Sequence, residues 1–291
     1  MMLLDQALVY LNGHYQPLCD AKISVLDRGF LFGDGVYEVI PSYQGKLFSL
    51  DDHLNRLAKS LESIRMANPH SKSQWSEIFQ PLLDLTKDQY IYLQITRGVA
   101  PKRDHSFSSD LEPTIFAMSA DIAPSEHLHS GSKALTIEDT RWHLCNVKAT
   151  TLLANILLRQ EALDQQCAEA ILIKNDLVLE GAASNIFVVK DGVISTPSQN
   201  SNILPGITRK VIIELIQNQN IPFQETAITT DTLKRADEIW LTSSTKEIMA
   251  VTHLNDKTVA NAQPGKLWRN MMSLYQQYKE ILRHGPESSK E

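Results

Sequence analysis

A run of short apolar strands in the second half of the sequence constrains the fold more than any other feature. From Glu169 to Val189 the apolar stretches are separated by turn residues at Lys174-Asn175-Asp176 and at Glu180 to Ser184, and Asp191-Gly192 marks the next hairpin. Strands joined by such short turns predict a sheet built as a meander. The second turn opens with a carboxylate, Glu180. The residues after it are small and would leave room for a flat, ring-shaped ligand.

The first half of the sequence also opens with sheet and then alternates with helices. Asn12-Gly13 accepts the positive φ angles of a type I′ hairpin between two short strands. The alternation from Val36 to Ile40 puts Glu38 on one strand face and Tyr37 on the other. The remaining periodicity predicts helices at about 51–66, 73–85, 152–165, 208–219, 230–236 and 265–278, and strands at about 90–96 and 114–120.

Length and composition favour two domains. The 291 residues are 43% apolar, enough for two moderate cores. The stretch 121–132 is polar, contains Pro124 and Gly131, and has no sustained periodicity. We therefore expect an N-terminal α/β domain at 1–120, a linker at 121–132 and a C-terminal domain at 133–291.

Charge and cysteine usage argue against several classes of partner. The net charge of −6 comes from 28 basic and 34 acidic residues spread along the chain, which favours neither nucleic acid nor a membrane surface. No apolar run approaches the ~20 residues of a membrane span. The three cysteines, Cys19, Cys145 and Cys167, lie far apart without metal-ligand spacing. This predicts reduced thiols in a cytoplasmic protein with no metal site.

Four segments together suggest a pyridoxal phosphate site. Such a site needs a lysine for the Schiff base, an anion against the ring nitrogen, and amide and hydroxyl donors for the phosphate. Lys148, Glu180, the helix start at Gly206-Ile207-Thr208 and the hydroxyl row Thr242-Ser243-Ser244-Thr245 can supply them. Alone, each has an ordinary explanation as a solvated lysine, a strand-end acid or a helix cap. No glycine-rich dinucleotide fingerprint or Walker motif competes with this hypothesis.

A family resemblance rests on motifs that follow one another in order along the chain. They are Leu26-Asp27-Arg28-Gly29, Phe32-Gly33-Asp34-Gly35-Val36-Tyr37-Glu38, His53-x-x-Arg56-Leu57, Thr96-Arg97-Gly98, Lys148, Glu180-Gly181-x-x-Ser184-Asn185, Gly206-Ile207-Thr208-Arg209 and Thr242-Ser243-Ser244. Together they resemble the class IV, or fold-type IV, pyridoxal phosphate-dependent aminotransferases. The resemblance covers about residues 5 to 280.

The resemblance implies an α/β (α+β) fold of two domains. The first would be an open sheet with flanking helices and the second a barrel-like sheet with helices, with the cofactor in the cleft between them and a homodimer as the assembly. It implies these roles: Lys148 as the catalytic lysine; Arg56, Glu180, Ile207, Thr208, Ser243 and Ser244 in binding pyridoxal 5'-phosphate; and Tyr37, Arg103 and His105 in binding the substrate carboxylate.

The loop Pro101-Lys102-Arg103-Asp104-His105 separates members of this family. It resembles the Arg-x-His motif of D-amino acid aminotransferases, in which arginine can grip a carboxylate with two parallel bonds and histidine adds a donor. Lys102 looks like one extra residue that could compete for that carboxylate, and Ser108 stands where relatives commonly carry proline.

The function implied is transamination between D-alanine and 2-oxoglutarate, giving pyruvate and D-glutamate. Alternatives on the same fold are a branched-chain L-amino acid aminotransferase, an aminodeoxychorismate lyase and an R-selective amine transaminase. A binding protein without catalysis is a further alternative, against which the presence of both Lys148 and Glu180 argues.

Overall fold

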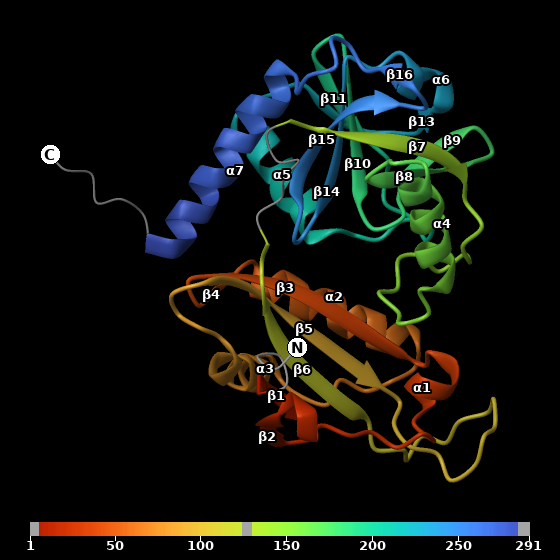
Figure 1. Ribbon diagram of the computed structural model, residues 1–291, viewed down its shortest axis with the longest axis vertical. Coiled ribbons are helices and arrows are strands. Elements are labelled where there is room, and N and C mark those ends of the chain that lie inside the picture. Colours follow the sequence, from red (N-terminus) through yellow and green to blue (C-terminus); the bar gives the residue numbers. More distant parts are fainter. Residues whose placement is uncertain (1–5, 124–129, 285–291) are drawn as a thin grey trace, which may run out of the picture. The chain divides into compact units, whose positions relative to one another are not determined.

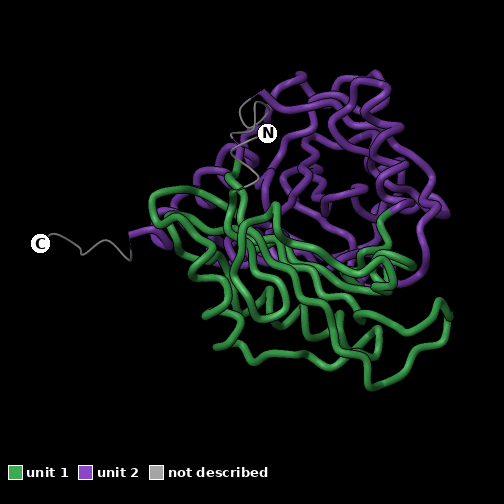
Figure 2. Tube along the Cα trace, turned by 60° about the horizontal axis from the view of Figure 1, so that its bottom comes forward, with its two compact units in different colours: residues 1–122, 147–152 green, residues 123–146, 153–291 purple. Residues whose placement is uncertain are grey.

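A computed structural model describes residues 6–123 and 130–284, which form two compact units. Figure 2 shows the units as Met1–Ile122 with Val147–Leu152, and Ala123–Asn146 with Leu153–Glu291. The short segment that carries Lys148 thus belongs to the first unit, although it lies within the stretch 133–291. Residues 124–129 of the expected linker lie outside the described residues.

The first unit contains a six-stranded antiparallel sheet with the strand order β2-β1-β6-β5-β3-β4 (Figure 1). Its strands are β1 (Leu8–Leu11), β2 (His14–Pro17), β3 (Gly35–Tyr43), β4 (Lys46–Leu47), β5 (Asp88–Thr96) and β6 (Thr114–Asp121). Its helices are α1 (Arg28–Phe32), α2 (Leu50–Ser63), α3 (Lys72–Phe79) and the 3-10 turns η1 (Leu18–Asp20) and η2 (Gln80–Leu82). The hairpin expected at Asn12-Gly13 is confirmed by the pairing of β1 with β2.

Helix α2 covers one face of this sheet because its apolar residues recur at helical spacing. Leu54, Leu57 and Leu61 are buried in the core together with β3 and β5 residues. The helix expected at 73–85 is shorter, since α3 ends at Phe79 and gives way to a 3-10 turn. Pro81 explains the difference, because proline has no N–H with which to continue the helix.

The second unit contains a ten-stranded sheet that curls into a half-barrel, in the order β12-β11-β10-β14-β15-β7-β8-β9-β13 with β16 beside β15 (Figure 1). Its strands are β7 (Ser132–Glu138), β8 (Glu169–Lys174), β9 (Leu177–Gly181), β10 (Asn185–Lys190), β11 (Val193–Thr196), β12 (Phe223–Glu225), β13 (Ile228–Thr229), β14 (Glu238–Ser243), β15 (Glu247–Leu254) and β16 (Lys257–Thr258). Its helices are α4 (Leu153–Asp164), α5 (Ile207–Asn218), α6 (Thr230–Lys234) and α7 (Lys266–His284).

The expected meander is correct at one turn and wrong at the next. Strands β8 and β9 pair as a hairpin across Asn175-Asp176, as predicted. After the turn from Glu180 to Ser184, however, β10 does not pair with β9 but with β11 and β14. Turn residues specify that the chain reverses, whereas the strand partner is chosen by the curl of the whole sheet.

Candidate functional site

Lys148 is held by its backbone in the first unit. Its N–H donates to Ser60 Oγ at 3.1 Å, and its carbonyl accepts from the N–H of Tyr37 at 2.9 Å. An isolated bridge between Val36 and Ala149 continues this pairing along β3. The Lys148 Nζ lies 4.2 Å from the centroid of the Tyr37 ring, within the range of a cation–π contact. The structure therefore brings together two predicted site residues, Lys148 and Tyr37.

Arg56 lies on the buried face of α2, one turn after His53, and both contact Glu38 of β3. Arg56 donates from Nε to Glu38 Oε1 at 2.9 Å and from Nη2 to Oε2 at 2.7 Å, and His53 Nδ1 lies 2.8 Å from Oε2. Burial would raise the pKa of Glu38, but the charge and hydrogen bonds of Arg56, with the hydrogen bond of His53, hold it at about 2. Glu38 thus stays ionised and fixes the position of the Arg56 guanidinium.

Glu38 and His53 were not assigned a role from sequence. The strand alternation nevertheless contained a signal, because Glu38 shares its strand face with Val36 and Ile40, which are fully buried. A carboxylate on a buried face requires a cationic partner. Its partners, His53 and Arg56, lie on the buried face of the next helix, α2.

Arg103 and His105 lie in the exposed loop between β5 and β6. The Arg103 guanidinium carbon lies 5.1 Å from the centroid of the Phe32 ring, and the His105 ring lies 5.5 Å from the same ring. The structure therefore brings these two predicted residues together over Phe32. Lys102, which the sequence suggested as a competitor for the carboxylate, forms an ion pair with Asp104 on the surface, with Nζ and Oδ2 3.1 Å apart.

Glu180 is the centre of a buried polar network in the second unit. Its Oε1 accepts from Arg141 Nη1 at 2.7 Å, and its Oε2 accepts from Asn185 Nδ2 and from the Leu204 N–H, each at 3.0 Å. Arg141 is in turn held by Asp139. Burial raises the pKa of Glu180 to about 7 even though Arg141 opposes the shift. An additional cation beside this carboxylate would therefore stabilise its ionised form.

Arg141 and Asp139 were missed in the sequence. Their spacing lets one carboxylate hold one guanidinium, with Arg141 Nε 3.0 Å from Asp139 Oδ1. Nothing in that short pattern points to Glu180, which is 39 residues away along the chain. Only the fold of the second unit brings the three side chains together.

Asn185 connects Glu180 to the predicted phosphate-binding segments. Asn185 lies opposite Thr242 in the pairing of β10 with β14. Thr242 is followed by Ser243, the last residue of β14. The Asn185 side chain also donates to the Leu204 carbonyl at 2.9 Å, just before helix α5. A Cβ added at Gly206 would lie 1.9 Å from Asn185 Oδ1, so the absence of a side chain there leaves room for this network.

The start of α5 leaves backbone donors available, as expected from sequence. Gly206 is the N-cap, no side chain caps the helix, and Ile207 and Thr208 form its first turn. Beside it, Ser243 Oγ accepts from the Lys246 N–H at 3.3 Å, and Ser244 follows in the turn. The Thr242 hydroxyl is buried without a hydrogen-bond partner within the part of the chain that the structure describes. Amides and hydroxyls of this kind suit an anion.

Two further observations apply to the described residues. None of their helices is both long enough and apolar enough to cross a membrane. Among the same residues, no group of three or more histidine, cysteine, aspartate or glutamate side chains is arranged to hold a metal ion.

Comparison with known proteins identifies the class. The family model for amino-transferase class IV matches residues 35–254. The chain therefore belongs to the class IV aminotransferases.

Individual relatives extend the match to nearly the whole chain. The D-alanine aminotransferase of Staphylococcus epidermidis is 39% identical over 274 residues, which cover 93% of this chain and 97% of the relative. The D-alanine aminotransferase of Bacillus licheniformis is 37% identical, covering 92% of this chain and 95% of the relative.

A solved structure supports the fold. The branched-chain amino acid aminotransferase from Escherichia coli superposes with a TM-score of 0.87 at 23% identity, covering 98% of this chain and 97% of the other. The expected α/β fold of type IV, with an open sheet and a barrel-like sheet, is confirmed.

Proposed function

We propose that this class IV aminotransferase acts on D-amino acids, transferring the amino group of D-alanine to 2-oxoglutarate to give pyruvate and D-glutamate. The observation that carries the proposal is that Arg103 and His105 both contact the ring of Phe32. It occurs in a chain that aligns with D-alanine aminotransferases over 92–93% of its length. A guanidinium and an imidazole gathered at one aromatic ring offer hydrogen-bond donors that suit an α-carboxylate.

Pyridoxal 5'-phosphate is the proposed cofactor. When bound, it supplies an electron-withdrawing ring that stabilises negative charge at the substrate Cα. Glu180 suits the protonated ring nitrogen. Burial raises the pKa of this carboxyl to about 7, so a cation beside it would stabilise the ionised form. The uncapped start of α5 and the unpartnered Thr242 hydroxyl, both within the described part of the chain, support a nearby phosphate.

Each remaining predicted residue has a proposed role. The Lys148 amine would act first as a base, by removing the proton from the substrate Cα. It would then act as an acid, by donating a proton back in the second part of the half-reaction. Tyr37, whose ring contacts that amine, would bind the carboxylate with Arg103 and His105. The proposed phosphate-binding groups are Arg56, the Ile207 and Thr208 amides, and the Ser243 and Ser244 hydroxyls.

A panel of amino donors tests the proposed substrate. With 2-oxoglutarate or pyruvate as acceptor, the enzyme is expected to deaminate D-alanine at least about 100-fold faster than L-alanine or L-leucine, because the carboxylate grip presents one face of Cα. Initial rates with each donor measure this ratio. A preference for L-leucine would establish the branched-chain alternative, and a preference for amines without a carboxylate would establish the amine transaminase. No turnover with a bound cofactor would indicate a binding protein.

We also propose a homodimer in the cytoplasm. Helix α4 supports the dimer, because Leu153, Ile156 and Leu157 form an apolar stripe at helical spacing and are 59–70% exposed. Cys19, Cys145 and Cys167 are free thiols, which suits a reducing compartment.

The dimer is expected to show twice the mass of one chain in sedimentation equilibrium. Leu157→Asp should weaken it at least about tenfold by placing a charge in the stripe, whereas Gln277→Asp, at an exposed position of α7 outside the stripe, should not. A wild-type protein that sediments as a single chain at all concentrations contradicts the proposal.

A further inference from the structure

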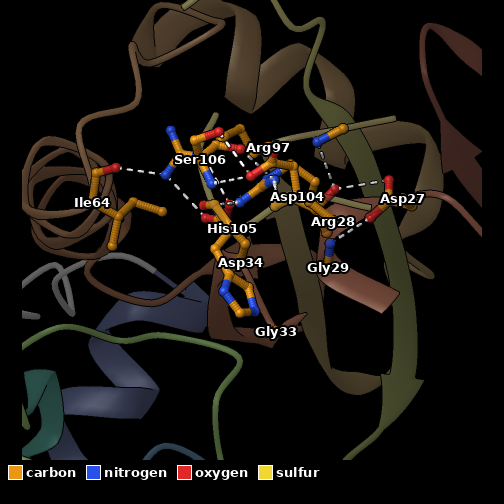
Figure 3. Close-up of polar contacts among 12 residues, drawn as sticks. Asp27, Arg28, Gly29, Gly33, Asp34, Ile64, Arg97, Asp104, His105 and Ser106 are labelled. Atoms are coloured by element: carbon orange, nitrogen blue, oxygen red, sulfur yellow. Dashed lines mark hydrogen bonds and ion pairs between the residues drawn. The ribbon is translucent and has the colours of Figure 1, made fainter. Parts of the chain in front are cut away.

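A buried arginine of the first unit binds the backbone of the loop that carries Arg103 and His105. Arg28 is 3% exposed. Its Nη1 donates to the carbonyl oxygens of Asp104 at 2.6 Å and Ser106 at 3.1 Å, and its Nη2 donates to that of His105 at 3.1 Å (Figure 3). One planar guanidinium thus binds three consecutive carbonyl groups, and its fixed donor directions restrict the loop backbone to one arrangement.

Arg28 is itself held by a carboxylate that it shares with a second arginine. Its Nε donates to Asp34 Oδ2 at 2.8 Å, and Arg97 donates to both oxygens of Asp34, at 2.8 and 2.9 Å (Figure 3). The other bonds of Arg97 go to the Ile64 and Arg65 carbonyls at the end of α2. The two arginines therefore share one anion, but Arg28 is the one that binds the three loop carbonyls.

The ring of Phe32 lies against the side chains that this loop carries. It contacts the Arg103 guanidinium and the His105 ring at the distances given above, and the Arg28 guanidinium carbon lies 4.9 Å from its centroid. The loop has no regular strand or helix between the end of β5 and the start of β6. Its geometry therefore depends on contacts of this kind.

We propose that Arg28 and Phe32 are positioning residues that hold Arg103 and His105 in the arrangement that binds a carboxylate. The proposal rests on the proposed function, which assigns the substrate carboxylate to Arg103 and His105. Arg28 and Phe32 act through the loop and do not touch the substrate. Two donors that are held in place before the ligand arrives do not have to be ordered on binding, so affinity for the carboxylate rises.

The test uses propionate, a carboxylate without an amine, as a competitive inhibitor of the holoenzyme against D-alanine. Arg103→Met should raise its inhibition constant at least about tenfold, and Arg28→Lys and Phe32→Leu should each raise it about five- to tenfold. Lysine keeps the charge beside Asp34 but cannot bind three carbonyls at once. Bound cofactor, measured by absorbance, verifies that each variant is folded.

Arg97→Lys is the matched control. Like Arg28→Lys, this substitution shortens an arginine side chain that binds Asp34, and it keeps a cation near the Phe107 ring. Arg28, which binds the three loop carbonyls, is unchanged. The inhibition constant of Arg97→Lys should stay within about twofold of wild type. In the double variant Arg28→Lys with Arg103→Met, the combined effect should fall short of the product of the single effects, because Arg28 acts through Arg103.

The outcomes separate this proposal from the proposed function. If Arg103→Met leaves the inhibition constant unchanged, the carboxylate assignment of the proposed function fails, and the positioning role falls with it. If Arg103→Met raises the constant while Arg28→Lys and Phe32→Leu do not, only the positioning role is overturned. It is also overturned if Arg97→Lys matches Arg28→Lys, or if the single effects multiply. Should Arg28→Lys fail to bind cofactor, Phe32→Leu decides.

Discussion

Replacing Lys148 with alanine is expected to reduce turnover of D-alanine by at least about 1,000-fold and to abolish covalent attachment of the cofactor by borohydride. The backbone of this residue is held by Ser60 and Tyr37 through main-chain groups, which alanine retains. The substitution therefore removes the amine and leaves its surroundings in place. A coupled assay measures turnover, and the mass of the intact protein after borohydride treatment measures attachment.

Lys246 offers the matched control for this experiment. Burial lowers the pKa of Lys246, so this amine loses its proton more readily than an exposed lysine. Lys246→Ala should still become covalently labelled when cofactor and borohydride are added. Labelling of Lys148→Ala to the wild-type extent would assign the catalytic role to another lysine.

Glu180→Gln is expected to slow removal of the Cα proton by about 100-fold or more while weakening cofactor affinity by less than about tenfold. A neutral amide cannot stabilise positive charge on the ring nitrogen, and it leaves Arg141 without its second carboxylate. The phosphate-binding candidates at α5 and at Ser243 are unchanged. Single-turnover absorbance changes with D-alanine, compared with Cα-deuterated D-alanine, measure the proton-transfer step.

Glu169→Gln controls for the loss of any buried carboxylate in the same sheet. Glu169 is fully buried on β8, and burial raises its pKa as well. Its hydrogen bonds go to the Ala170 N–H and Ser184 Oγ rather than to Arg141. Proton removal in this variant should stay within about threefold of wild type. Similar slowing in both variants would mean that the sheet was disturbed, and no slowing in Glu180→Gln would assign the ring nitrogen to another acid.

Local patterns in the sequence were sufficient for most individual elements. The hairpin at Asn12-Gly13 forms because those residues accept positive φ, and Asn12 and Gly13 have φ angles of 48° and 92°. The alternation correctly put Glu38 on the strand face opposite Tyr37, and the structure shows that the face of Glu38 is the buried one. The predicted end of a helix was wrong where a single residue interrupts the helical pattern, as Pro81 does after α3. Spacing of two or 3.6 residues reports on short stretches of chain, so it predicts elements well and their ends less well.

The order of motifs along the chain was also sufficient for the family, which the comparisons confirmed. It supplied the candidates for the site because each residue type has a chemical capacity of its own. Lysine can act as a nucleophile, glutamate can neutralise a cation and a helix start can bind an anion. These capacities belong to the residues before the chain folds.

Tertiary structure alone decided which side chains meet. It joined Lys148 to β3, paired β10 with β14 so that Asn185 lies opposite Thr242, and placed Arg141 on Glu180. It also directed Arg28 to the carbonyls of a loop 76 to 78 residues away. Such contacts depend on strand order and on the curl of a sheet, which arise from the packing of the whole unit. No local spacing in the sequence records them, because residues that meet in this way are neighbours only after the chain has folded.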